Sequence, residues 1–281
     1  MLRPGLWAAL CVLVLGLVVG IATDGTPNIG LCLPDREDSF RITEHLQEIG
    51  LEACSVQDEN LSQVAALVVN DPTMAEQLYF PQMPAIYVDI QPAGKDAYIG
   101  GDAAQAGRLQ AQMLLATASQ GDWNEDGVVT CYLLGARLTR PDMQAWGEAI
   151  RKTLEEAGLK PEIIGSLGTG ISREQGKLVC GEALADYGRD LEVIFAYTDA
   201  LTLGALDAVT DSGRTVDENI TLLGAGRSQA TAEQAQQGII TGYAGMDEAA
   251  FVRALQQELT RAAGGAEPRS WTLPYTAYPA A

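Results

Sequence analysis

The chain has 281 residues, of which 47% are hydrophobic, and its formal net charge at pH 7 is -19. This length allows about two domains of ordinary size, each with its own core. The acidic excess argues against nucleic acid and anionic membrane surfaces as partners, because both attract cationic proteins.

The N-terminal segment is apolar without interruption over residues 6–22, after Arg3 and before a polar stretch that ends at Pro27. It is short for a spanning helix and slightly long for the core of a signal peptide. Two interpretations stay open: export with cleavage after Ala22, or a retained anchor with Arg3 on the cytoplasmic side. Both place residues 1–26 outside the folded domains and the folded part outside the cytoplasmic membrane.

The five cysteines contain no pair spaced for zinc binding or redox chemistry. Cys32 and Cys131 lie in strand-like apolar runs, which favours buried, inert thiols. A disulfide between Cys32 and Cys54 is compatible with an exported chain and stays open.

From Asn28 onward, short β-rich runs alternate with helical patterns, which is typical of βαβ units around parallel sheets. The predicted strands are residues 29–33, 51–55, 65–69, 85–89, 128–134, 161–164, 192–196 and 220–224. The predicted helices include residues 40–49, 103–119, 141–157, 173–187, 199–212 and 230–237. Residues 56–64 are too few for a full crossover helix, so we expect a trimmed first lobe.

A change of character near Gly100-Gly101 separates two such series and predicts two doubly wound α/β lobes. Residues 246–264 have a helical pattern and residues 272–277 a strand pattern, so we expect the helix to return to the first lobe and the strand to the second. The predicted crossovers are near residues 100–102, 245–247 and 269–271. The predicted lobes are residues 27–101 with 246–268, and residues 102–245 with 269–281.

Polar and aromatic side chains follow several of the predicted strands. Ligands bind at the carboxyl ends of parallel strands, so two facing lobes would gather these side chains in one cleft. Aromatic rings stack on sugar faces, and carboxylates accept hydrogen bonds from hydroxyl groups. We therefore predict a polyhydroxylated ligand; the candidate ligand-binding residues are Asp38, Phe40, Asp89, Arg140, Asp142 and Trp146. For Asp38 and Asp142, helix capping is the alternative.

Residues 122–130, with the sequence DWNEDGVVT, carry oxygen-bearing side chains on alternate residues and then a glycine. A calcium loop uses side chains at positions 1, 3 and 5, glycine at 6, a carbonyl at 7 and a further ligand at 9. The residues in the ligand positions are Asp122, Asn124, Asp126, Val128 and Thr130. Position 12 is Leu133, so a distant carboxylate must complete the shell. The alternative is a surface turn, although a turn has no reason to space these residues by two.

The sequence lacks the motifs of an enzyme. His45 is the single histidine, and no cysteine or serine motif lies near it. Gly224-Ala225-Gly226 follows a predicted strand, but Gln229 stands where a dinucleotide-binding fingerprint has its third glycine. We therefore predict a binding protein and not an enzyme.

The chain resembles the galactose/glucose-binding proteins, which are type I periplasmic binding proteins of sugar ABC importers. The likeness covers residues 28–279 and is strongest over residues 121–205. Its motifs are the loop at 122–130, Tyr98-Ile99-Gly100-Gly101-Asp102, Pro141-Asp142, Thr198-Asp199-Ala200 and Leu273-Pro274-Tyr275. The resemblance implies the two-lobed fold, Ca2+ in the loop with Glu192 as the remote bidentate carboxylate, a sugar-like ligand, and an ABC permease as partner.

The sugar pocket departs from the family pattern. Asp38, Phe40 and Asp142 match, but the family has asparagine, histidine and arginine at the positions of Asp89, Arg140 and Trp146. The family's stacking tryptophan aligns near Ser172, and its ligands from later strands align near Thr198, Gly226 and Gly245. We therefore expect the metal site to carry over better than the pocket, and no glucose or galactose binding of the family kind.

Three functions follow from these observations. The leading one is an exported solute-binding protein of a sugar importer. The alternative is a degenerate, membrane-tethered sensor ectodomain or adaptor with little or no sugar binding. A transcriptional repressor shares this fold, but the apolar start stands where a basic DNA-binding helix pair would lie, which argues against it.

Overall fold

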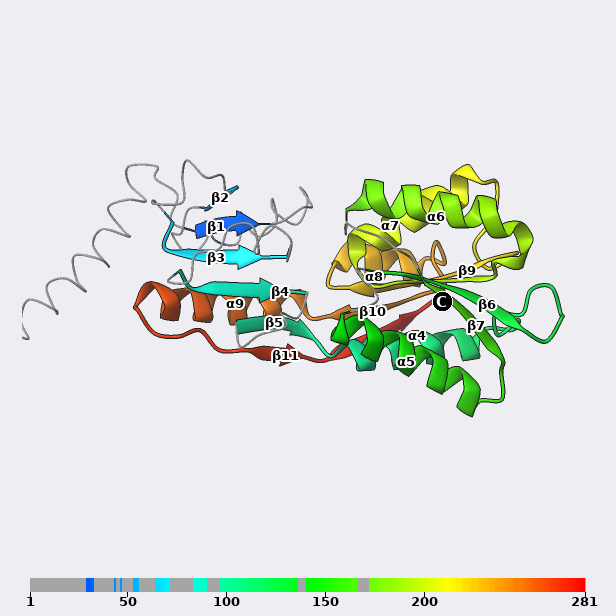
Figure 1. Ribbon diagram of the computed structural model, residues 1–281, viewed down its shortest axis with the longest axis horizontal. Helices are drawn as coiled ribbons and strands as arrows, with labels where there is room; N and C mark the ends of the chain where they lie inside the picture. The colour runs from blue at the N-terminus through cyan, green and yellow to red at the C-terminus, as the bar shows by residue number, and fades with distance from the viewer. Residues whose placement is uncertain are drawn as a thin grey trace, which may run out of the picture. The chain divides into compact units, whose positions relative to one another are not determined.

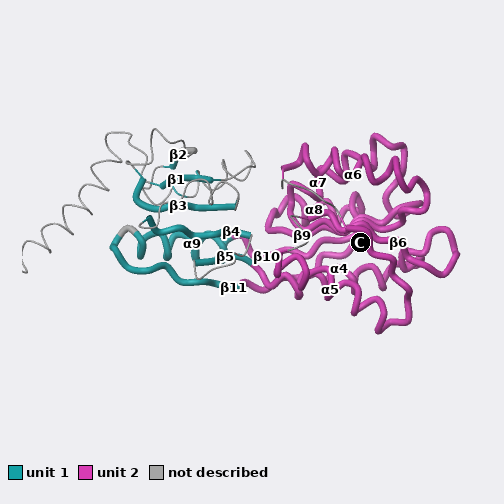
Figure 2. The backbone as a smooth tube through the Cα atoms, in the orientation of Figure 1, with its two compact units in different colours: residues 1–100, 249–272 teal, residues 101–248, 273–281 magenta. Residues whose placement is uncertain are grey.

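The chain folds, in the computed structural model, into two compact units that each combine segments distant in sequence (Figure 2). Unit 1 comprises Met1–Gly100 and Ala249–Thr272, and unit 2 comprises Gly101–Glu248 and Leu273–Ala281, so the chain passes between the units three times. The described residues are 29–32, 43, 46, 53–55, 64–70, 83–89, 97–135, 140–165 and 172–280. The N-terminal apolar run, Asp38, Phe40 and His45 lie outside them.

Unit 1 is built on a six-stranded sheet with the order β11-β5-β4-β3-β1-β2 (Figure 1). Its strands are β1 (Ile29–Cys32), β2 (Ala53–Ser55), β3 (Ala66–Val69), β4 (Ala85–Val88), β5 (Ala97–Gly101) and β11 (Trp271–Leu273). Strands β1 to β5 pair in parallel. Every residue of β1 and β3 is buried, as expected for parallel strands that are covered on both faces.

Helix α9 (Glu248–Ala263) buries one apolar stripe in unit 1. Phe251, Leu255 and Leu259 recur every four residues and are at most 3% exposed, which is the pattern of a helix with one buried face. The same helix buries Glu258, whose carboxylate accepts hydrogen bonds from Arg269 N–H at 2.7 Å and Trp271 Nε1–H at 2.9 Å. These bonds fasten the segment that enters β11.

Unit 2 is built on a second six-stranded sheet with the order β12-β10-β9-β8-β6-β7. Its strands are β6 (Val129–Leu134), β7 (Pro161–Gly165), β8 (Val193–Ala196), β9 (Thr221–Gly226), β10 (Gly242–Met246) and β12 (Tyr275–Pro279). All described pairs are parallel except β10 with β12, which is antiparallel. Helices α4 and α5 cover one face of the sheet, and α6, α7 and α8 cover the other (Figure 1).

The helices of unit 2 are α4 (Ala103–Ala116), α5 (Pro141–Glu156), α6 (Arg173–Tyr187), α7 (Asp199–Asp211) and α8 (Gln229–Gln236), with a short 3-10 helix, η2 (Gly188–Asp190), after α6. Asp102, Ser172, Thr198 and Ser228 cap α4, α6, α7 and α8, and each accepts a bond from an N–H of the first turn. Helix α5 begins without a side-chain cap. Among the described residues, none of the helices is long and apolar enough to span a membrane.

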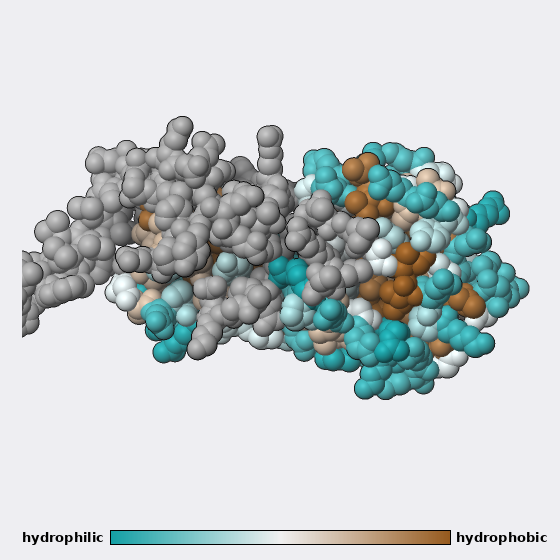
Figure 3. Space-filling model, viewed as in Figure 1, coloured by the Kyte–Doolittle hydropathy of each residue, from teal (hydrophilic) through white to brown (hydrophobic). Residues whose placement is uncertain are grey.

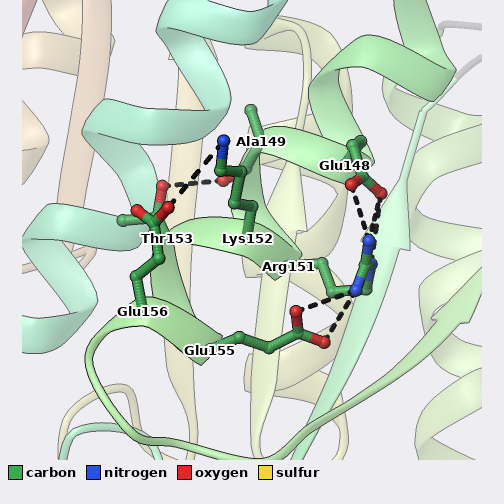
Figure 4. A network of polar contacts seen from close by, with 7 residues as sticks. All are labelled: Glu148, Ala149, Arg151, Lys152, Thr153, Glu155 and Glu156. Atoms are coloured by element: carbon green, nitrogen blue, oxygen red, sulfur yellow. Dashed lines mark hydrogen bonds and ion pairs between the residues drawn. The ribbon is translucent and has the colours of Figure 1, made fainter.

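Hydrophilic residues cover much of the visible surface of unit 2 (Figure 3). On the exposed side of α5, Arg151 contacts Glu148 at 2.6 Å and Glu155 at 2.7 Å (Figure 4). Water screens exposed ion pairs of this kind, so they contribute little to stability. The fold of unit 2 depends instead on the side chains that its helices bury against the sheet.

The predicted α/β class with parallel sheets is confirmed. The single strand predicted over residues 272–277 is wrong, because β11 lies in the first sheet and β12 in the second, with Pro274 between them. Proline has no N–H to donate to a strand ladder, which favours a break at this residue. Strands β5 and β10 are not predicted from the sequence; each contains two glycines, and glycine is depleted in strands.

Cys131 and Cys180 are buried free thiols, and Cys32 is buried as well. This confirms the buried positions predicted for Cys32 and Cys131. The disulfide between Cys32 and Cys54 stays a prediction, because the Cys54 side chain lies outside the described part of the chain. Burial raises the pKa of Cys180 to about 12, so its thiol stays protonated at neutral pH.

Candidate functional site

The carboxyl edge of the second sheet contains a point where the direction of winding reverses. The chain passes from β6 to its neighbour β7 and then returns to β8 on the other side of β6. In doubly wound sheets, ligands bind outside the carboxyl ends of the strands at such a point. Arg140 and Asp142 follow β6, and Tyr197 and Thr198 follow β8. This edge is the candidate ligand site of unit 2.

Arg140 and Asp142 form a two-point ion pair at this edge. Arg140 Nε lies 3.1 Å from Asp142 Oδ1, and Arg140 Nη2 lies 3.2 Å from Asp142 Oδ2. Asp142 is only 6% exposed. The alternative that Asp142 caps α5 is wrong, because Arg140 occupies the N-cap position and Asp142 lies within the first turn. The structure therefore brings two predicted ligand-binding residues together and partly neutralises both.

Trp146 belongs to the core. Its side chain is 0% exposed, and its ring centroid lies 5.2 Å from that of Tyr197 at a tilt of 57°. A Cβ atom at Gly135 would come within 3.2 Å of the indole, so this glycine makes room for the ring. The prediction that Trp146 stacks on a sugar is corrected, because the helical spacing of α5 turns it toward the sheet.

Gln110 is a buried residue at this edge that sequence reasoning misses. It lies in α4, is 0% exposed, and accepts a hydrogen bond from Trp146 Nε1–H at 2.7 Å. Its Nε2 group donates to the Ala196 carbonyl at 2.9 Å and to the Leu223 carbonyl at 3.2 Å. Because the described β8–β9 register ends at Phe195 and Leu223, Gln110 joins the two strands where their ladder stops. The available signal is a long amide within the buried stripe of an amphipathic helix.

In unit 1, Asp89 follows β4 at the carboxyl edge of the first sheet. Its φ of 59° lies in the left-handed region, which aspartate enters more readily than most residues. Its N–H donates to the Ile99 carbonyl at 3.2 Å, so the chain turns directly after the strand. Asp38 and Phe40 follow β1 in sequence and lie outside the described residues.

The predicted cation loop is closed by its own side chains. Asp122 accepts bonds from the N–H groups of Asp126 and Gly127, both at 3.1 Å. Asn124 Oδ1 accepts from Asp126 N–H at 2.9 Å, and Asp126 Oδ1 accepts from Val128 N–H at 2.8 Å. Gly127 has a φ of 81°, which a side chain would strain, so glycine is required at this bend.

Glu192 connects the loop to the start of β8. It is 0% exposed, and its carboxylate accepts from the N–H groups of Trp123 at 2.7 Å, Asn124 at 3.0 Å and Thr130 at 3.0 Å. Burial raises the pKa of Glu192, the three N–H groups oppose this rise, and the charge of Asp122 adds to it. The carboxylate that the resemblance assigns to the loop is therefore hydrogen-bonded to the loop backbone.

The donor atoms of this loop suit calcium in type, because calcium prefers carboxylate, amide, carbonyl and hydroxyl oxygens. Their arrangement is different, since Asp122, Asp126 and Glu192 all accept backbone N–H bonds. Within the described part of the chain, no group of three acidic, histidine or cysteine side chains is arranged to hold a metal ion. Cation binding would require these oxygens to turn toward a common centre.

A family profile described as "Periplasmic binding protein domain" matches residues 82–267, which is more than half of the chain. The chain belongs to this family. The match reaches from unit 1 through unit 2 and back into unit 1. Together with the two doubly wound sheets, it establishes the type I periplasmic binding protein fold.

Solved structures share this periplasmic binding protein fold. A solute-binding protein of an ABC transporter from Actinobacillus succinogenes, with bound D-allose, is 18% identical over 89% of this chain and 96% of that chain, with a TM-score of 0.62. One from Bacillus halodurans, with bound myo-inositol, is 18% identical over 90% and 94%, with a TM-score of 0.64. The Cra transcriptional dual regulator from Pseudomonas putida, in complex with fructose 1-phosphate, is 20% identical over 90% and 98%, with a TM-score of 0.63. At these identities the likeness establishes the fold alone.

Two positions where the resemblance places sugar ligands have no room for a side chain in this periplasmic binding protein. A Cβ atom at Gly226 would lie 2.3 Å from the Asp199 carboxylate, and one at Gly245 would lie 2.8 Å from the Tyr243 ring. The hydroxyl of Thr198, at a third such position, caps α7 by accepting from Leu201 N–H at 3.2 Å. Of these three positions, only Thr198 carries a polar side chain, and its hydroxyl is engaged in capping α7.

Asp199 fills the space beside Gly226 and organises the end of β9. Its carboxylate accepts from the N–H groups of Arg227 at 2.9 Å and Ser228 at 3.1 Å, and Tyr243 donates its hydroxyl to it at 2.6 Å. Burial, followed by the charge of Asp199, raises the pKa of Tyr243 well above its usual value. The tyrosine therefore remains a hydroxyl donor. Sequence reasoning places Asp199 at this edge but does not predict this structural role.

Proposed function

We propose that this protein is an extracytoplasmic solute-binding protein that binds a small sugar-like molecule and presents it to an ABC permease. The observation that carries the proposal is the Arg140–Asp142 pair at the switch point of a periplasmic binding protein domain. A carboxylate and a guanidinium side by side offer acceptors and donors to the hydroxyl groups of one ligand. The first lobe would contribute Asp38, Phe40 and Asp89, with the ligand in the cleft between the lobes.

The proposed ligand is a neutral polyol that differs from glucose and galactose. Gly226 and Gly245 have no space for polar side chains, and Trp146 is buried, so much of the family's wall around a pyranose is missing. Asp142 already pairs with Arg140, so this pair has no excess positive charge to attract an acidic sugar. Allose and inositol, which the two bacterial neighbours bind, are neutral and rich in hydroxyl groups.

Calorimetric titration of the purified full chain tests this function. We expect binding of D-allose, myo-inositol or a related neutral polyol, and weaker binding of glucuronate, glucose and galactose. Asp142→Asn should weaken the binding by about tenfold or more, because it removes a charged acceptor. Glu148→Gln, on the exposed side of the same helix, should leave it unchanged. Tight binding of glucose or galactose would contradict the proposed pocket.

We also propose that Ca2+ binds to the loop at residues 122–130. The ligands would be Asp122, Asn124, Asp126, the Val128 carbonyl, Thr130 and Glu192. The support for this is the spacing of the oxygens in the loop and the buried carboxylate behind it. The ion would supply a fixed positive charge that binds the loop to the start of β8 and so stabilises unit 2.

The alternative function is a membrane-tethered sensor ectodomain or adaptor. It is favoured by the apolar run at residues 6–22 together with the incomplete sugar wall. Sequencing the N-terminus of the mature protein separates the two: a chain that starts after Ala22 is released, and a chain that keeps Arg3 is anchored. An anchored chain that binds none of the sugars above would support the alternative.

A further inference from the structure

Asn70 has a buried amide oxygen without a hydrogen-bond partner among the described residues. The residue directly follows β3 and is 3% exposed. Its Oδ1 atom has no hydrogen-bond partner in the described part of the chain. Leaving a buried acceptor without a donor is costly, so each such atom in a native protein requires an explanation.

The position of Asn70 in the sheet distinguishes it from the other buried atoms of this kind. The chain passes from β1 to β2 on one side and then to β3 on the other side of β1, so β1 and β3 flank the switch point of the first sheet. Asn70 N–H donates to the carbonyl of Cys32, the last residue of β1, at 3.0 Å. Within the described part of the chain, the other buried atoms without a hydrogen bond belong to Thr231 and Gln234 in α8 and to Arg261 in α9, whose Nε lies 3.2 Å from Glu258. Asn70 is the one at a strand end beside a switch point.

We propose that Asn70 is a specificity-determining residue whose amide accepts a hydrogen bond from a hydroxyl group of a neutral polyol. The proposal rests on the solute-binding function above and adds a residue that the resemblance does not assign. A sugar hydroxyl is a donor that can reach one acceptor and still accept another bond. The amide would thus be unsatisfied in the free protein and satisfied in the complex, which makes binding discriminate against ligands without a hydroxyl at this place.

Two variants test this role by opposite signatures. Asn70→Ala removes the unsatisfied oxygen, so we expect the melting temperature without sugar to stay equal or rise, while the affinity for D-allose or myo-inositol falls about tenfold or more. Asn219→Ala is the control. Asn219 lies before β9, at the amino edge of the second sheet and therefore away from the carboxyl edge where ligands bind, and it accepts a hydrogen bond from Thr215 N–H at 3.2 Å. This control variant should lower the melting temperature and leave the affinity unchanged.

The measurements are calorimetric titration with the two sugars and thermal unfolding of the full chain without them. Unchanged affinity in Asn70→Ala would overturn the role of Asn70 while leaving the proposed function intact. A lower melting temperature together with unchanged affinity would show that a buried water satisfies the amide instead. If the wild-type protein binds neither sugar, nor any related neutral polyol, the proposed function fails and the role of Asn70 fails with it.

Discussion

The cation loop and the ligand edge of unit 2 satisfy their polar groups over very different distances in the chain. Within the loop, Asp122, Asn124 and Asp126 bond to N–H groups at most five residues away, and one remote carboxylate completes the arrangement. At the edge, Gln110 joins Trp146, Ala196 and Leu223, which are 36, 86 and 113 residues away. Local spacing is visible in a sequence, whereas such long-range bonds depend on the fold.

The largest effect is expected at the ligand edge. Trp146→Ala should lower the free energy of unfolding by about 3–5 kcal/mol, because it empties a buried site and leaves the Gln110 oxygen without its donor. Urea denaturation measures this loss. Trp123→Ala is the matched control in the loop, where the indole is only half-buried and donates to Thr221 Oγ1 at 3.0 Å. If the two variants lose the same stability, the burial of Trp146 and its bond to Gln110 do not determine the size of the loss.

Calcium removal tests the loop. A ligand that binds only the folded state stabilises it by about 2.7 kcal/mol at a hundredfold excess over Kd. We therefore expect chelation to lower the melting temperature of the wild type and to change the fluorescence of Trp123, while Glu192→Gln shows neither response. Glu125→Gln, at a loop position that supplies no ligand, should respond as the wild type does. Identical melting of the wild type with and without chelator would mean that hydrogen bonds alone close the loop.

Tyr243→Phe tests how much one buried bond contributes at the end of β9. Losing the bond to Asp199 should cost about 1–3 kcal/mol at neutral pH. The folded-state pKa of Tyr243 is raised above the unfolded value of about 10, so its contribution is present below that pH and is lost as pH rises further. The variant should therefore flatten the alkaline loss of stability by up to about 1.4 kcal/mol per pH unit.

The measurement is the free energy of unfolding of the wild type and of Tyr243→Phe at pH 7 and at several values between pH 9 and 11. Tyr187→Phe is the control, because Tyr187 is 41% exposed at the end of α6. An unchanged alkaline slope in Tyr243→Phe would show that the buried hydroxyl does not govern this pH range.

The sequence predicts the architecture well because the signals are periodic. All five predicted helices of unit 2 and α9 of unit 1 are present, and the pattern of residues 29–33 and 65–69 anticipates the buried strands β1 and β3. The predictions fail where the local sequence disfavours the strand that the fold contains. Glycines weaken the strand signal of β5 and β10, and Pro274 divides the last predicted strand. Tertiary context places these segments in the sheets despite their weak propensity.

The candidate site is predictable only in part, for a related reason. The sequence places Arg140 and Asp142 after β6, and the structure joins them. The sequence cannot show that Trp146 points inward and bonds to Gln110, because helical spacing does not say which element packs against a given face of the helix. Asn70 is equally hidden, since an unsatisfied oxygen becomes visible only when burial and partners are known.

The smallest effect is expected on the outer surface of α5, away from both regions. Arg151 has the most charged contacts in this helix, with Glu148 and Glu155 (Figure 4), whereas Lys152 approaches Glu156 only at 3.8 Å. Because all of these side chains are exposed, salt and water screen their charges. Arg151→Ala should therefore lower the melting temperature by no more than about 2 °C at low salt, with the difference vanishing at high salt. Lys152→Ala should be indistinguishable from the wild type in both. A loss in Arg151→Ala that approaches that of Trp146→Ala and persists in salt would show that the number of charged contacts, and not burial, sets the stability of unit 2.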